Sequence, residues 1–171
     1  MGPGMTEGIE PARETAPQIK TVRAAGRWRG DYRNDLAVRE FSFTTAEPER
    51  IGGGNEGPTP MEYVAGALNG CLGIVIELVA KERGIALDGL KIDSAGLVDQ
   101  RGLFGTAEVS PHFQSVEIAI ALATSAPAEQ VEALQRDTLK RCPVYNLIRD
   151  SGAKVSVAWT VTAGDEPGDE R

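Results

Sequence analysis

The sequence predicts a single α+β domain, in which antiparallel strands form sheets and the helices lie in a separate layer. Two observations support this fold class. Segments with strand-like alternation lie on both sides of a long, almost wholly apolar helical segment at residues 57–84, and a second amphipathic helix is followed by a last alternating segment. The 171 residues, 41% of them hydrophobic, are enough to bury one core.

The two ends of the chain differ from this central part. Residues 1–18 are rich in Gly, Pro, Glu and Thr without periodicity, and residues 164–171 form an acidic run, GDEPGDER. Neither end contains enough apolar residues for their burial to offset the conformational entropy lost on ordering. We therefore expect a disordered arm at 1–18, a folded domain at 19–163 and a disordered acidic tail at 164–171.

Residues 19–33 and 36–45 read as strands of an antiparallel hairpin or meander. Turn-forming residues lie between them, namely Gly30, Asp31, Asn34 and Asp35. Residues 46–60 are rich in Pro and Gly, which predicts a flexible loop without an element of its own.

The long helix has clear start and stop signals. Thr59 and Glu62 form a T-x-x-E capping box around Pro60, and Gly84 follows two cations of the last turn. On a helical wheel, three costly glycines share one narrow stripe: Gly66, Gly70 and Gly73. We expect the backbone of a neighbouring helix, from a second copy of the chain, to pack along this stripe.

The second half of the chain alternates strands and helices. Residues 89–100 and 116–125 read as strands, and DQRGLFG at 99–105 reads as a turn between them. A helix is expected at about 127–140, a short helical segment at 143–150 beginning with Cys142 as its cap, and a last strand at 154–163.

Composition excludes several classes of function. The net charge of −7 and the pI near 4.8 argue against nucleic acid or an anionic membrane as partner. The apolar helix is interrupted by Glu62, Asn69 and Glu77, and no signal peptide precedes it, so a cytoplasmic protein is expected. With two cysteines and one histidine, His112, no metal and no cofactor are expected.

The two cysteines are the candidates for chemistry. Cys71 alone is more simply explained as a buried packing residue, but a second thiol is what a peroxide-reducing cycle needs as resolving partner. Cys142 lies at a helix start, which lowers a thiol pKa. Activation of Cys71 requires a cation, and the arginines of the first strands are the supply: Arg27, Arg29, Arg33 and Arg39. Glu62 either orients such an arginine or serves only as a helix cap.

Three passages resemble the OsmC/Ohr family of osmotically inducible and organic hydroperoxide resistance proteins. They are GGGNEGPTPMEYVAGALNGCL around Cys71, DQRGLFG, and LKRCPVYNLIR around Cys142. The resemblance extends from about residue 19 to 162, and DQRGLFG is similar to a less characterised OsmC-like branch. It implies an intertwined homodimer, in which long central helices are wrapped by antiparallel sheets and the active sites lie at the interface.

The resemblance also implies a thiol peroxidase of the oxidative stress response that reduces organic hydroperoxides. Cys71 matches the peroxidatic cysteine, which becomes a sulfenic acid, and Cys142 the resolving cysteine, which forms a disulfide with it. A lipoyl- or thioredoxin-type dithiol would restore both thiols. Arg27 is the nearest match to the catalytic arginine, with Arg29 and Arg33 as alternatives.

One position departs from the family pattern. Met61 stands where the peroxidases have a glutamate, and Glu62 follows one residue later, turned by about 100° on the helix. Two other functions therefore stay open: a redox-inert protein that binds a small apolar ligand, and a thiol-disulfide regulator of other proteins.

Overall fold

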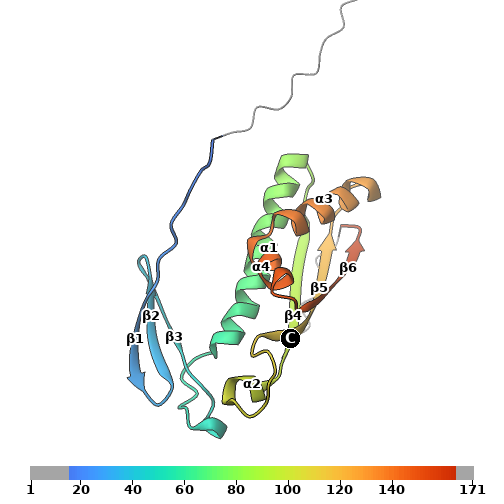
Figure 1. The fold of residues 1–171 in the computed structure, drawn as a ribbon. Coiled ribbons are helices and arrows are strands. Elements are labelled where there is room, and N and C mark those ends of the chain that lie inside the picture. The colour runs from blue at the N-terminus through green and yellow to red at the C-terminus, as the bar shows by residue number, and fades with distance from the viewer. Residues whose placement is uncertain (1–15, 165–171) are drawn as a thin grey trace, which may run out of the picture.

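The structure is a computed structural model that describes residues 16–164, so nearly all of the expected arm and tail lie outside the described residues (Figure 1). The elements follow one another along the chain as β1 (Ala25–Gly30), β2 (Arg33–Val38), β3 (Phe41–Thr45), the 3₁₀ turn η1 (Glu49–Ile51), α1 (Pro60–Arg83), β4 (Gly89–Val98), α2 (Gln100–Phe104), β5 (Phe113–Ala123), α3 (Ala128–Arg141), α4 (Pro143–Asp150) and β6 (Lys154–Thr162). This order confirms the predicted α+β class.

The second sheet and the helices enclose the core. The sheet has the order β4-β5-β6, and α1, α3 and α4 cover one of its faces (Figure 1). Alternate residues of β5 point into the core, as predicted: Val116, Ile118, Ile120 and Leu122. They join apolar side chains of α1 and α3, among them Leu72, Ile76 and Leu134, in one cluster. The long helix is therefore fixed against the sheet along one face.

Strand direction in this sheet is mixed. β4 and β5 pair antiparallel, as expected, whereas β5 and β6 pair parallel. The parallel pair follows from the connection, because α3 and α4 lie between the two strands and carry the chain back to the same end of the sheet.

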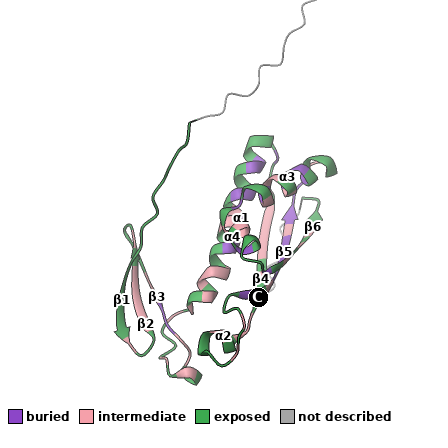
Figure 2. Cartoon of the chain, in the orientation of Figure 1, coloured by how far each residue is buried: buried purple, intermediate pink, exposed green. Residues whose placement is uncertain are grey.

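The first sheet, β1-β2-β3, lies apart from the second sheet and from most of α1 (Figure 1). It is attached near the start of α1, where the Tyr63 hydroxyl donates to the Thr44 carbonyl (2.9 Å) and the Tyr63 ring packs on Phe43. Much of its surface is exposed (Figure 2), and the Trp28 side chain is 73% exposed. Trp28 is thus no core residue within this chain.

The structure corrects four local predictions. Residues 36–45 form parts of two strands, because the chain reverses at Arg39 with a left-handed φ of 56°, and Asn34 and Asp35 lie in β2 rather than in a turn. The loop at 46–60 contains η1. DQRGLFG forms helix α2, which begins because the Asp99 side chain accepts a hydrogen bond from the Arg101 backbone N–H.

α1 is also long and apolar enough, by length and composition, to cross a membrane, with a mean hydropathy of 1.7 in its most apolar window. The core helix of a soluble protein has the same properties. Only 33% of that window is buried within the chain, so a large part of the α1 surface has no cover in a single copy.

Candidate functional site

The predicted cap fixes α1 and with it the position of Cys71. The Thr59 hydroxyl accepts a hydrogen bond from the Glu62 backbone N–H (3.3 Å), and the Glu62 carboxylate accepts one from the Thr59 N–H (2.7 Å). Gly84 ends the helix in the left-handed conformation. Cys71 lies in the middle of this rigid element, half-buried, and contacts the core cluster.

Cys142 lies at the break between α3 and α4. Cys142 is both the C-cap of α3 and the N-cap of α4, and its side chain is fully buried. The two cysteine Sγ atoms are 3.3 Å apart, although 71 positions separate the residues in the sequence. Both are free thiols. The structure therefore brings together the two cysteines that the sequence singled out.

The surroundings of Cys142 keep its thiol protonated. Burial raises the pKa of Cys142 to about 11, and the neighbouring Cys71 sulfur adds to the rise. The backbone N–H groups of Tyr145 and Val144 lower the pKa, but no side-chain cap hydrogen bond is formed and burial dominates. The expectation that a helix start lowers the pKa of this thiol is thus wrong, because desolvation outweighs the helix end.

The geometry gives the two thiols different roles in their contact. The Cys142 thiol is placed to donate its hydrogen to the Cys71 sulfur. Cys71 is then the sulfur that accepts, and it is also the more exposed of the two. An anionic Cys142 would have to form in a desolvated position, which disfavours the charged form.

The arginines predicted to activate Cys71 do not reach it within the chain. Arg29 and Arg33 form ion pairs with Asp35 of the same sheet, and Arg33 also pairs with Glu56. These carboxylates raise the pKa of the Arg33 guanidinium. Arg27 is exposed on β1 opposite Asp35 and forms no ion pair among the described residues. Of the three, Arg27 is the one whose charge is not engaged by a carboxylate.

Glu62 occupies the cap, as described above, and forms no ion pair with an arginine within the described part of the chain. Its neighbour Met61 lines a cavity of about 420 Å³ between the start of α1, η1 and α2. The cavity wall combines apolar residues, such as Leu103 and Val98, with three charged ones, Glu47, Arg50 and Glu62. A small, mainly apolar molecule would fit this volume.

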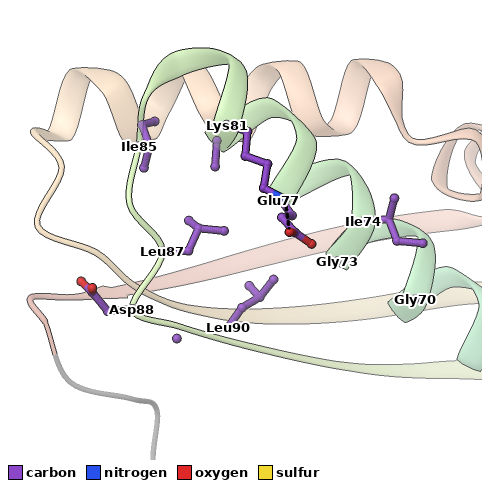
Figure 3. A pocket seen from close by; sticks show the side chains of 11 residues that line it. Gly70, Gly73, Ile74, Glu77, Lys81, Ile85, Leu87, Asp88 and Leu90 are labelled. Carbon is purple, nitrogen blue, oxygen red and sulfur yellow. Dashed lines mark hydrogen bonds and ion pairs between the residues drawn. The ribbon is translucent and has the colours of Figure 1, made fainter.

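A second hollow of about 660 Å³ lies along the glycine stripe of α1 (Figure 3). Gly70 and Gly73 form its helical wall, and Leu87, just before β4, and Leu90, at the start of β4, contribute from the other side. Glu77 and Lys81, which form an ion pair, lie at its polar side. The stripe predicted from the three glycines is therefore an open surface within a single copy.

One residue near the thiols has a structural role that its place in the family pattern did not assign. The side-chain amide of Asn146, on the first turn of α4, donates to the carbonyls of Leu139, Lys140 and Cys142. The signal was present in the sequence: Pro143 cannot donate a backbone hydrogen bond, and an amide side chain follows three residues later. In residues 16–164 no group of three or more His, Cys, Asp or Glu side chains could hold a metal ion.

Comparison with known proteins agrees with this fold. The sequence pattern of the family described as OsmC-like protein matches residues 53–158, which is more than half of the chain. No curated protein sequence matches significantly. The structure is similar to an OsmC-like protein from Mycoplasma pneumoniae, at 16% identity and a TM-score of 0.70, covering 85% of this chain and 99% of that one.

Two further solved structures carry names related to hydroperoxides. One is an organic hydroperoxide resistance protein OsmC from Legionella pneumophila, with 21% identity, a TM-score of 0.60 and coverage of 85% of this chain and 99% of that one. The other is an organic hydroperoxide resistance protein from Elizabethkingia anophelis, with 18% identity, a TM-score of 0.63 and coverage of 86% and 99%. At these identities the likeness establishes the fold, and together with the sequence match it places the chain in the OsmC-like protein family.

Proposed function

We propose that the protein is a cysteine-based thiol peroxidase that reduces organic hydroperoxides. The observation that carries this proposal is the 3.3 Å separation of the Cys71 and Cys142 sulfur atoms, with one thiol half-buried and the other fully buried. A peroxidatic cysteine must be accessible to the substrate, which suits the half-buried Cys71. A resolving cysteine needs to reach only the peroxidatic sulfur, which suits the fully buried Cys142.

The proposed cycle has three steps. The Cys71 thiolate attacks the outer oxygen of the hydroperoxide, the O–O bond breaks, and the alkoxide takes a proton and leaves as an alcohol. Cys71 is thereby oxidised to a sulfenic acid. The Cys142 sulfur then attacks the Cys71 sulfur, a disulfide forms, and water leaves with the Cys142 proton. A dithiol reduces this disulfide and is itself oxidised.

The proposed active form is a homodimer. Two features of the single chain favour it: α1 has a partly uncovered apolar surface, with Ile74 70% exposed, and the first sheet has an exposed Trp28 and an unpaired Arg27. A second copy that covers α1 with its first sheet would bury these side chains. It would also supply the cation that Cys71 lacks within the described part of its own chain, for which Arg27 is the best candidate.

A peroxide-consumption assay tests the function. The pure protein is incubated with cumene hydroperoxide and dihydrolipoamide, and the loss of hydroperoxide is followed with time. We expect turnover by the wild type and none by Cys71→Ser, with Ser125→Ala, at an exposed position of the loop between β5 and α3, as a control substitution of similar size. The proposal is wrong if Cys71→Ser consumes hydroperoxide as fast as the wild type.

A redox-inert ligand-binding protein is the second candidate. It is favoured by the cavity of about 420 Å³ beside Met61, together with the lack of any arginine bonded to Cys71 within the described chain. Native mass spectrometry of the freshly purified protein would detect a bound small molecule. A bound ligand, combined with failure to form the Cys71–Cys142 disulfide after hydroperoxide treatment, would favour this function over the peroxidase.

A further inference from the structure

The break between α3 and α4 leaves backbone carbonyls without their usual donors. In a continuous helix the residue at 143 would donate its N–H to the Leu139 carbonyl, four residues earlier, but Pro143 has no N–H. The last regular bond of α3 is that from the Cys142 N–H to the Thr138 carbonyl (2.9 Å). The angle between the two helices is therefore not set by continuous backbone bonding.

The Asn146 side chain fills this gap. Its Nδ2 atom lies 2.9 Å from the Leu139 carbonyl oxygen, 3.3 Å from that of Lys140 and 2.8 Å from that of Cys142. The Asn146 backbone N–H also donates to the Cys142 carbonyl (3.1 Å). One side chain on α4 thus holds the last turn of α3 and the peptide group of Cys142 at the same time.

We propose that Asn146 is a positioning residue, which holds Cys142 where its sulfur can bond to that of Cys71. A disulfide requires the sulfur atoms to approach to about 2.05 Å, so the present gap must close by only about 1.3 Å. A hinge that moved freely at Pro143 would let Cys142 sample many other positions. Asn146 restricts that motion and so raises the effective concentration of one thiol at the other.

This role deepens the proposed peroxidase function, but it can be tested without hydroperoxide. The protein is equilibrated with mixtures of oxidised and reduced dithiothreitol, and the fraction of the Cys71–Cys142 disulfide is measured. In this exchange the two protein thiols lose two electrons and two protons to the oxidised reagent. We expect Asn146→Ala to shift the equilibrium about tenfold toward the dithiol form, because it loses the two N–H donors that the three carbonyls share.

Two more variants separate positioning from general stability. Asn146→Asp has the shape of asparagine but no N–H donor, so it should shift the equilibrium at least as far. Gln114→Ala is the matched control, because Gln114, at the start of β5, also donates its side-chain amide to two backbone carbonyls, those of Ser110 and His112 in the preceding loop. Asn146 has no positioning role if Asn146→Ala leaves the equilibrium within about twofold of the Gln114→Ala value. The same holds if the wild type forms no disulfide in this buffer.

With hydroperoxide the two half-reactions can be followed separately in a single turnover. Oxidation of Cys71 to the sulfenic acid should have the same rate in Asn146→Ala as in the wild type, and disulfide formation should be about tenfold slower. Equal slowing of both steps would contradict a role confined to Cys142. If the wild type forms the disulfide with the reagent but never consumes hydroperoxide, the peroxidase proposal fails and the role of Asn146 stands.

Discussion

The sulfur atoms of Cys71 and Cys142 lie 3.3 Å apart in unlike surroundings, one half-buried on α1 and the other fully buried at the start of α4. Both supporting elements are firmly anchored, α1 by its capping box and core packing and α4 by Asn146 and the buried Ile148. The distance suits disulfide formation with little movement, and the difference in burial distinguishes the two sulfurs.

Removal of the buried thiol should stop the cycle after its first step. Cys142→Ser should react once with hydroperoxide and keep Cys71 as a sulfenic acid, because no second sulfur is available to condense with it. Mass spectrometry after dimedone labelling should then show one adduct at Cys71. Cys71→Ser should show no adduct, and an adduct at Cys142 in that variant would reverse the assigned roles.

The raised pKa of Cys142 predicts a loss of stability in alkali. The reduced native protein keeps a proton on Cys142 that the unfolded chain releases above the ordinary pKa of 9.0. Stability from this group is therefore complete below pH 9 and is lost as the pH rises through about 11. A shift of this size corresponds to roughly 2 to 3 kcal/mol.

Urea unfolding of the reduced protein at several pH values between 8 and 11 measures this loss. The free energy of unfolding of Cys142→Ala should fall less over the same pH range. Other groups titrate in both proteins, but only the wild type contains the buried thiol. Parallel curves for the two proteins would mean that Cys142 is not the group responsible.

The elements with strong local signals were predictable from sequence. The Thr59–Glu62 capping box, Gly84 and the alternation at Val116 to Leu122 all appear where expected, because each depends on neighbours within a few residues. The parallel pairing of β6 could not be read from its own alternation. It depends on how α3 and α4 turn the chain, which is a tertiary property.

The features of the candidate site also divide into those with a signal in the sequence and those that depend on the tertiary structure. The pairing of the two cysteines was expected only from the family resemblance, since spacing alone cannot bring residues 71 and 142 together. The pKa of Cys142 was predicted in the wrong direction, because the helix start is visible in the sequence whereas full burial is not. The first-sheet arginines could not be placed, because that sheet lies apart from most of α1, the helix that carries Cys71.

Glu62 can be assigned to the cap or to catalysis by two substitutions. Glu62→Gln keeps an oxygen that can accept from the Thr59 N–H, so the free energy of unfolding should change little, whereas Glu62→Ala should lose about 1 kcal/mol. If Glu62 serves only as a cap, the rate of Cys71 oxidation should be equal in Glu62→Gln and the wild type. A tenfold or greater fall in Glu62→Gln, at unchanged stability, would instead assign its charge to the active site.

The glycine stripe of α1 gives opposite predictions for a single copy and for a dimer. Within the chain, a Cβ atom added at Gly66 or Gly70 would meet nothing within 4 Å, so Gly70→Ala should stabilise an isolated chain by about 1 kcal/mol. If a second α1 packs along the stripe, as its three glycines lead us to expect, a larger side chain must separate the helices. Gly70→Leu should therefore shift the protein from dimer to monomer in sedimentation equilibrium and lower peroxidase activity with it.

Gln130→Leu, which adds the same side chain at an exposed position of α3, is the control and should remain dimeric. A Gly70→Leu protein that stays dimeric would place the interface elsewhere, and a monomeric wild type would exclude the dimer altogether.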